Sequence, residues 1–173
     1  CLAYRKADGS LMLQSRKGDP YKLQHIHDQL QWLGPGSVLD GELYVHGASQ
    51  QSINSLVRRP REESRCIFYC IYDLLSWGGT TGTWAERRGW IEGLFSSLYP
   101  WPNLWQVPSI VVQDEVGVLE LQRQFVADGY EGAIVRTHGG EYREGYRSPD
   151  LLKVKSWNDA EFPIIGFTVG RGK

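Results

Sequence analysis

Two short segments in the last third of the chain carry residues whose types and spacing suit phosphate chemistry. Glu131 opens the run Glu-Gly-Ala-Ile-Val-Arg, which ends at Arg136, and Leu-Leu-Lys-Val-Lys follows at 151–155. Successive side chains of a strand alternate faces, so Lys153 and Lys155 would project from one side. Two ammonium groups on one face attract an anion, and a carboxylate near that anion suits Mg²⁺, which is held by one or two carboxylates plus phosphate oxygens. The segments therefore predict a phosphate and metal site, with an exposed strand of solvated lysines as the alternative.

Other polar residues stand where a core strand would not hold them. Asp40 and Glu42 are two residues apart in an apolar, strand-like segment, so they share a face. A buried face of this kind needs a metal, a ligand or hydrogen bonds, whereas a solvent-facing edge needs none. Asp73 follows the apolar run at 68–72, and an ionised group there needs a partner unless it only caps a loop. Tyr72, the last residue of that run, suits either core packing or stacking on a base.

Hydrophobic periodicity predicts the elements that position these residues. Strands are expected at 2–6, 11–16, 38–45, 66–75 and 109–112, and again after Glu131. Helices are expected at 21–33, 50–58 and 116–126, with a further one beginning at Thr83. The hairpins among these strands predict an α+β domain with largely antiparallel sheets flanked by helices.

Local signals fix some details of these elements. Asp8-Gly9 is a two-residue hairpin signal that would place Lys6 opposite Leu11 and Tyr4 opposite Leu13. Thr83-Trp-Ala-Glu has the form of a capping box, and its helix should turn four apolar residues inward. These are Trp90, Ile91, Leu94 and Leu98.

Composition sets outer bounds on function. A chain of 173 residues that is 41% hydrophobic can build the core of one domain. The net charge of −1 gives no global attraction to nucleic acid, so polyanion binding must come from local basic clusters such as Arg58-Arg59-Pro60-Arg61. Three cysteines without framework spacing favour reduced thiols in an intracellular protein, with Cys66 and Cys70 expected in a core strand. No apolar run is long enough for a membrane span.

The order of the motifs is more informative than any one of them. The chain contains, in sequence, Ser-Arg-Lys-Gly at 15–18, Asp-Gly-Glu-Leu at 40–43, Phe-Tyr-Cys-Ile-Tyr-Asp-Leu-Leu at 68–75, the run at 131–136, Arg-Ser at 147–148 and Leu-Lys-Val-Lys at 152–155. Together these motifs resemble the adenylation domain of ATP-dependent DNA ligases, which has a nucleotidyltransferase (ATP-grasp-like) fold. The arginine at 136 is similar to the ATP-using ligases, whereas NAD-dependent bacterial ligases typically have lysine there.

The resemblance implies a role for each matching position in the nucleotide pocket. Glu42 would bind the ribose or a metal, and Tyr72 would stack on the adenine of ATP. Glu131 would hold Mg²⁺ near the reacting phosphate. Lys153 and Lys155 would neutralise the charge that develops on the α-phosphate.

Three arginines complete the set of site residues implied by the resemblance. Arg136 would assist at the nucleotide, Arg16 would touch a DNA phosphate, and Arg147 would serve either task. Reactions in the family pass through a lysine–AMP phosphoramidate and an AMP-capped 5′-phosphate before a 3′-hydroxyl seals the nick.

The nucleophilic lysine is where the chain departs from the family. The family places this lysine in Lys-x-Asp-Gly-x-Arg, and here Lys6-Ala-Asp-Gly is followed by Ser-Leu. In the family a complete hairpin separates the nucleophile from the Ser-Arg-x-Gly element, whereas Lys6 would lie inside that hairpin, shortly before Ser15. We therefore interpret Lys6 as a decoy and expect the nucleophile before Cys1.

The resemblance also predicts domains and partners. Residues 1–160 would form the adenylation domain and 161–173 the start of an OB-fold domain, because the segment 156–166 looks like the family's passage between the two. We expect a monomer that acts on nicked double-stranded DNA in replication, repair or recombination, in the cytoplasm or nucleus and without membrane contact. This segment alone would be inactive. The alternatives are an RNA ligase or mRNA-capping-type enzyme, or a non-catalytic nucleotide-binding or nucleic-acid-binding module.

Overall fold

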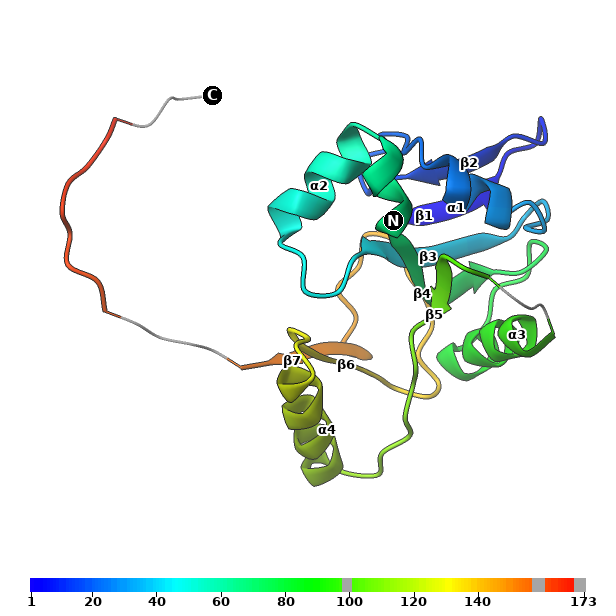
Figure 1. The fold of residues 1–173 in the computed structure, drawn as a ribbon. Helices are drawn as coiled ribbons and strands as arrows, with labels where there is room; N and C mark the ends of the chain where they lie inside the picture. Colours follow the sequence, from blue (N-terminus) through cyan, green and yellow to red (C-terminus); the bar gives the residue numbers. More distant parts are fainter. Residues whose placement is uncertain (98–100, 157–160, 170–173) are drawn as a thin grey trace.

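The computed structural model describes residues 1–97, 101–156 and 161–169, and it contains two sheets (Figure 1). The five-stranded sheet has the order β2-β1-β3-β4-β5, and β6 pairs with β7. The strands are β1 (Leu2–Arg5), β2 (Leu11–Gln14), β3 (Val38–Tyr44), β4 (Phe68–Ser76), β5 (Leu104–Gln106), β6 (Gly132–Arg136) and β7 (Leu151–Lys155). All neighbours pair antiparallel except β4 and β5, which are parallel.

Helices flank both sheets. They are α1 (Gln24–Gln29), α2 (Gln50–Arg58), the 3₁₀ helix η1 (Glu62–Cys66), α3 (Trp84–Ser97) and α4 (Glu115–Ala127). In Figure 1, α4 lies with β6 and β7, whereas α3 lies at the five-stranded sheet. The predicted α+β class with largely antiparallel sheets is therefore confirmed. No helix within the described ranges is long and apolar enough to cross a membrane.

The predicted helix at 21–33 is shorter than expected, but its apolar spacing identified core residues. Regular α-helix covers only α1, and the Leu33 amide donates to the Leu30 carbonyl at 3.0 Å, a three-residue spacing typical of tighter 3₁₀ turns. The side chains at the predicted positions are nevertheless all buried: Leu23, Ile26, Leu30 and Leu33. The hydrophobic face is thus maintained where the helix itself is not.

The predicted register of the first hairpin is wrong by one residue. Leu11 lies opposite Arg5 and Met12 opposite Tyr4, so the loop has three residues instead of two. Lys6 and Ser10 close this loop by a backbone hydrogen bond, and Gly9 has φ 84°. Asp8 favours this turn because its carboxylate accepts from the Ser10 amide and hydroxyl.

Two further predictions of local structure are corrected. The segment 109–112 forms no strand, and Ile110 and Val111 are exposed, while the parallel partner of β4 is β5 at Leu104–Gln106. The run Ile-Val-Val has strand-like composition, but it follows Pro108, which cannot donate to a ladder. Cys66 is exposed at the end of η1, two residues before β4 begins, whereas Cys70 is buried in β4 as expected.

The predicted capping box is confirmed at the start of α3. The Glu86 carboxylate accepts from the Thr83 amide at 2.7 Å, and the Thr83 hydroxyl accepts from the Glu86 amide at 3.4 Å. Of the four residues expected inward, Ile91 is buried and Trp90 and Leu94 pack against the core, while Leu98 lies outside the described residues.

Candidate nucleotide-binding site

The hairpin of β6 and β7 brings together the predicted phosphate-binding residues. Lys153 lies opposite Ile134 and Lys155 opposite Gly132, so both lysines project from one face of β7. A β-carbon at Gly132 would lie 2.2 Å from the Val154 carbonyl oxygen, so only glycine permits this approach of the strands. The predicted shared face of the two lysines is therefore confirmed.

Glu131, directly before β6, lies between the two ammonium groups. Its carboxylate accepts a hydrogen bond from Lys153 Nζ at 2.8 Å, and Lys155 Nζ lies 3.7 Å from the other carboxylate oxygen. The hydrogen bond from Lys153 lowers the pKa of Glu131, so this carboxylate is ionised at neutral pH. Because the side chains of Lys153 and Glu131 are 49% and 69% exposed, their ion pair adds little to stability and remains accessible to a ligand.

A second group of predicted residues lies on β3 and β4. Asp40 pairs with Asp73 and Gly41 with Ile71, which leaves Tyr72 unpaired in a β-bulge. Bulges re-aim side chains, and here the Tyr72 hydroxyl donates to the Asp40 carboxylate at 3.3 Å.

The side chains around this bulge differ in how deeply they are buried. Burial raises the pKa of Asp40, and burial together with the Asp40 charge raises the pKa of Tyr72. Glu42, two residues beyond Asp40, is exposed on β3. Burial also raises the pKa of the neighbouring Cys70 thiol to about 12, so this thiol stays neutral and does not act as a nucleophile at neutral pH.

The amino end of β1 enters the bulge region, whereas Lys6 lies at the other end of this strand. The Cys1 nitrogen donates to the Gly41 carbonyl at 2.7 Å and lies 3.6 Å from the Asp40 carboxylate. Lys6 is exposed in the hairpin loop, five residues further on, which corresponds to about 16 Å along an extended strand. Cys1 therefore lies far closer to the bulge than Lys6 does.

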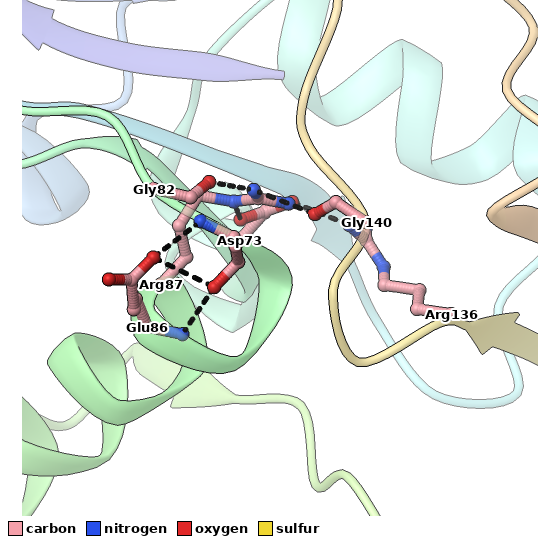
Figure 2. A network of polar contacts seen from close by, with 7 residues as sticks. Asp73, Gly82, Glu86, Arg87, Arg136 and Gly140 are labelled. Carbon is pink, nitrogen blue, oxygen red and sulfur yellow. Dashed lines mark hydrogen bonds and ion pairs between the residues drawn. The ribbon is translucent and has the colours of Figure 1, made fainter.

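Arg136, predicted to assist at the nucleotide, is held by a buried acidic residue. Asp73 is 1% exposed and accepts from Arg136 Nη1 at 2.5 Å and from Arg87 Nε at 2.8 Å. Arg87, 2% exposed, also donates to the carbonyls of Gly82 and Gly140, as Figure 2 shows. Asp73 thus has the partners that its burial requires, although it lies within β4 and does not end the strand.

Sequence reasoning missed Arg87 and the aromatic residue beside it. The Arg136 guanidinium lies 4.4 Å from the centre of the Trp84 ring, and 5.9 Å from that of Tyr72, within the range of cation–π attraction. Arg87 stands four residues before Ile91 on the inward face of the predicted helix. A charged residue on the inward face of a helix needs a buried partner, and Asp73 also lacked one in the sequence analysis. These two signals together could have predicted the ion pair between Arg87 and Asp73.

The remaining predicted residues lie apart from these groups in the chain. Arg16 is exposed in the loop after β2, and Arg147 is exposed in the segment between β6 and β7. Residues 161–169 form no helix or strand and extend away from the sheets (Figure 1). The predicted domain boundary at residue 160 lies outside the described residues.

The protein-family model described as ATP dependent DNA ligase domain matches residues 2–155 of this chain. A DNA ligase of African swine fever virus (isolate Pig/Kenya/KEN-50/1950) is 32% identical over 98% of this chain and 42% of its own length. The multifunctional non-homologous end joining protein LigD of Pseudomonas aeruginosa is 30% identical over 99% of this chain and 21% of its own length. This chain therefore spans less than half of each of these curated relatives.

Solved structures show the same fold. Chlorella virus DNA ligase-adenylate superposes with a TM-score of 0.70 at 19% identity, over 92% of this chain and 60% of that one. The ligase domain of M. tuberculosis LigD has a TM-score of 0.64 at 24% identity, over 91% and 51%. The matched motifs, the arrangement of the sheets and the family model agree, and the chain belongs to the ATP-dependent DNA ligase domain family.

Proposed function

We propose that this chain is the nucleotide-binding core of an ATP-dependent DNA ligase that seals nicks in double-stranded DNA. The observation that carries the proposal is the gathering of Glu131, Lys153 and Lys155 on one face, where Glu131 and Lys153 are exposed and Lys155 is partly exposed. Such a cluster contributes little to stability and is suited to binding a phosphate. The resemblance to ligases supplies the substrate, which is ATP.

Each half of the site would hold one part of the nucleotide. Tyr72 would stack on the adenine, and Glu42 would bind the ribose or a metal. Arg136, which lies beside the Tyr72 ring, would line the part of the site that holds the base. Lys153 and Lys155 would bind the α-phosphate and stabilise the negative charge that develops during transfer.

The carboxylates fit a Mg²⁺ ion of the kind that phosphate chemistry uses. No cluster of three or more His, Cys, Asp or Glu suited to a metal occurs in the part of the chain that the structure describes. Mg²⁺ needs only one or two protein carboxylates when phosphate oxygens complete its shell, and Glu131 is ionised at neutral pH. Glu131 and Glu42 would hold such an ion, which would supply positive charge to the phosphates.

The reaction would proceed through covalent AMP. A lysine amine would attack the α-phosphorus of ATP, lose a proton and release pyrophosphate. AMP would then pass to a 5′-phosphate, and a 3′-hydroxyl would displace it to form the phosphodiester. We infer that the lysine precedes Cys1, because the Cys1 nitrogen lies against Asp40 and Gly41 while Lys6 lies at the far end of β1.

Further parts of the proposal concern the whole protein. We infer an OB-fold domain after the adenylation domain, supported by the apolar side chains that residues 161–169 leave exposed: Phe162, Ile164, Ile165, Phe167 and Val169. Arg16 and Arg147, both exposed, would contact DNA phosphates. We propose a monomer inside the cell, and the three cysteines, all free thiols, support that location.

Substrate choice tests the proposal against the enzymatic alternatives. The whole encoded polypeptide, incubated with Mg²⁺ and ATP, is expected to seal a nick in DNA, with little sealing of nicked RNA and no covalent GMP from GTP. The measurement is gel separation of labelled 5′-phosphate strands. Preferred sealing of RNA would indicate an RNA ligase, and GMP transfer would indicate a capping-type enzyme. Binding of ATP with no covalent adduct would favour a non-catalytic module.

A further inference from the structure

Strand β6, which directly follows Glu131, is attached at both of its ends to the five-stranded sheet and its helices. At the last residue of β6, Arg136 binds Asp73, and beyond the strand the amides of Trp84 and Ala85 donate to the carbonyls of Gly140 and His138. Before β6, the attachment is aromatic. Tyr130 directly precedes Glu131, and its ring meets two rings from the end of β3.

The aromatic attachment consists of Tyr44, His46 and Tyr130, which we call the aromatic latch. Tyr44 and Tyr130 stack with centroids 6.4 Å apart and planes at 22°, and His46 lies 5.2 Å from Tyr130. The Tyr44 hydroxyl and His46 Nδ1 are joined by a 2.9 Å hydrogen bond. A β-carbon at Gly129 would lie 3.4 Å from two His46 ring atoms, so the imidazole also packs on this glycine.

The latch joins the neighbours of the two carboxylates assigned to the metal. Tyr44 follows Glu42 by two residues on β3, so both lie on one face of the strand. Tyr130 is bonded to Glu131. Stacking of the two tyrosines therefore restricts how far β3, which carries Glu42, and the segment that carries Glu131 can separate.

We propose that the aromatic latch is a positioning device that fixes Glu131 relative to Glu42, and with it the Mg²⁺ and phosphate side of the site. Such pairs add only a modest stabilisation beyond buried area, which suits rings that are half exposed. Their effect on chemistry can be much larger, because a displacement of about 1 Å can cost about 100-fold in rate. The inference rests on the proposed function, since it takes the two carboxylates as metal ligands.

The test compares Tyr130→Ala with Tyr130→Phe in the whole encoded polypeptide. Tyr130→Ala is expected to raise the Mg²⁺ concentration for half-maximal adenylation about tenfold and to lower the maximal rate. Tyr130→Phe keeps the stacked ring and should behave as wild type. Tyr44→Ala should show the same shift in Mg²⁺ concentration. The double variant Tyr44→Ala/Tyr130→Ala should show little more effect than either single variant.

Several results would contradict the proposed positioning role of the aromatic latch. One is an unchanged Mg²⁺ dependence in Tyr130→Ala, and another is a loss of rate that only follows the loss of thermal stability. A third is weaker binding of nicked DNA at unchanged Mg²⁺ dependence, because the rings would then be a stacking platform for bases. Absence of AMP transfer in the wild type would instead count against the proposed function.

A readout without nucleotide keeps the two proposals separate. Amide hydrogen exchange in β6, at 132–136, should be faster in Tyr130→Ala than in Tyr130→Phe, because the alanine variant loses the aromatic contact that directly precedes the strand. Equal protection in the two variants would contradict the latch whether or not the protein binds AMP.

Discussion

Replacing Lys153 with alanine is expected to slow adenylation of the whole encoded polypeptide about 100- to 1,000-fold, because one donor aimed at the developing phosphate charge is lost. The thermal midpoint should hardly change, since the ion pair of Lys153 with Glu131 is exposed. Single-turnover AMP transfer and thermal unfolding, measured on the same preparation, check both expectations.

Lys22→Ala is the matched control for this variant. Lys22 is also exposed, but it precedes α1 and belongs to neither half of the site. It should leave both AMP transfer and stability unchanged. If Lys153→Ala loses activity only in proportion to a fall in thermal stability, Lys153 is a structural surface residue and the phosphate assignment is wrong.

Replacing Arg87 with methionine should give the largest loss of stability. The change removes a buried bidentate partner of Asp73 and the donor to Gly82 and Gly140, and breaking a buried ion pair costs about 3–5 kcal/mol. For a chain of this size, about 2–4 °C of thermal midpoint is lost per kcal/mol. Calorimetry or circular dichroism melts measure the shift.

The neighbouring residue on the same helix provides the control. Arg88 makes an ion pair with Glu92 one turn away, and its side chain is 27% exposed. Such surface pairs contribute about 0.3–0.5 kcal/mol, and the hydrogen bond from Arg88 to the Ser109 carbonyl contributes about 1 kcal/mol, so Arg88→Met should cost much less than Arg87→Met. Equal melting temperatures for Arg87→Met and Arg88→Met would show that the Asp73 network does not stabilise the fold.

Local patterns predicted the elements of the fold where one physical signal dominated. The helix α2 and the capping box of α3 were found because periodicity and capping chemistry are local. The run Ile-Val-Val at 110–112 gave a wrong prediction because β propensity reflects packing against a neighbouring strand, and among the described residues no strand pairs with this run. The three-residue loop of the first hairpin was missed because Asp-Gly suits more than one turn length.

The candidate site was predictable in its parts but not in its assembly. Alternation in β7 was enough to place Lys153 and Lys155 on one face, and the burial of Asp73 demanded a partner. The identity of that partner required the packing of α3 on β4, which no local pattern contains. The same holds for the aromatic latch, since Tyr44 and Tyr130 are far apart in the chain and meet only through tertiary structure.

Mapping the adenylated lysine decides whether the nucleophile is Lys6 or a lysine before Cys1. The whole encoded polypeptide, incubated with Mg²⁺ and ATP, is digested, and the peptide that carries the mass of AMP is sequenced by mass spectrometry. We expect an adduct on a lysine upstream of Cys1, within a Lys-x-Asp-Gly-x-Arg motif, and no adduct on Lys6. An adduct on Lys6 would show that the proposed position of the nucleophile is wrong, because Lys6 would then have to reach the nucleotide from the far end of β1.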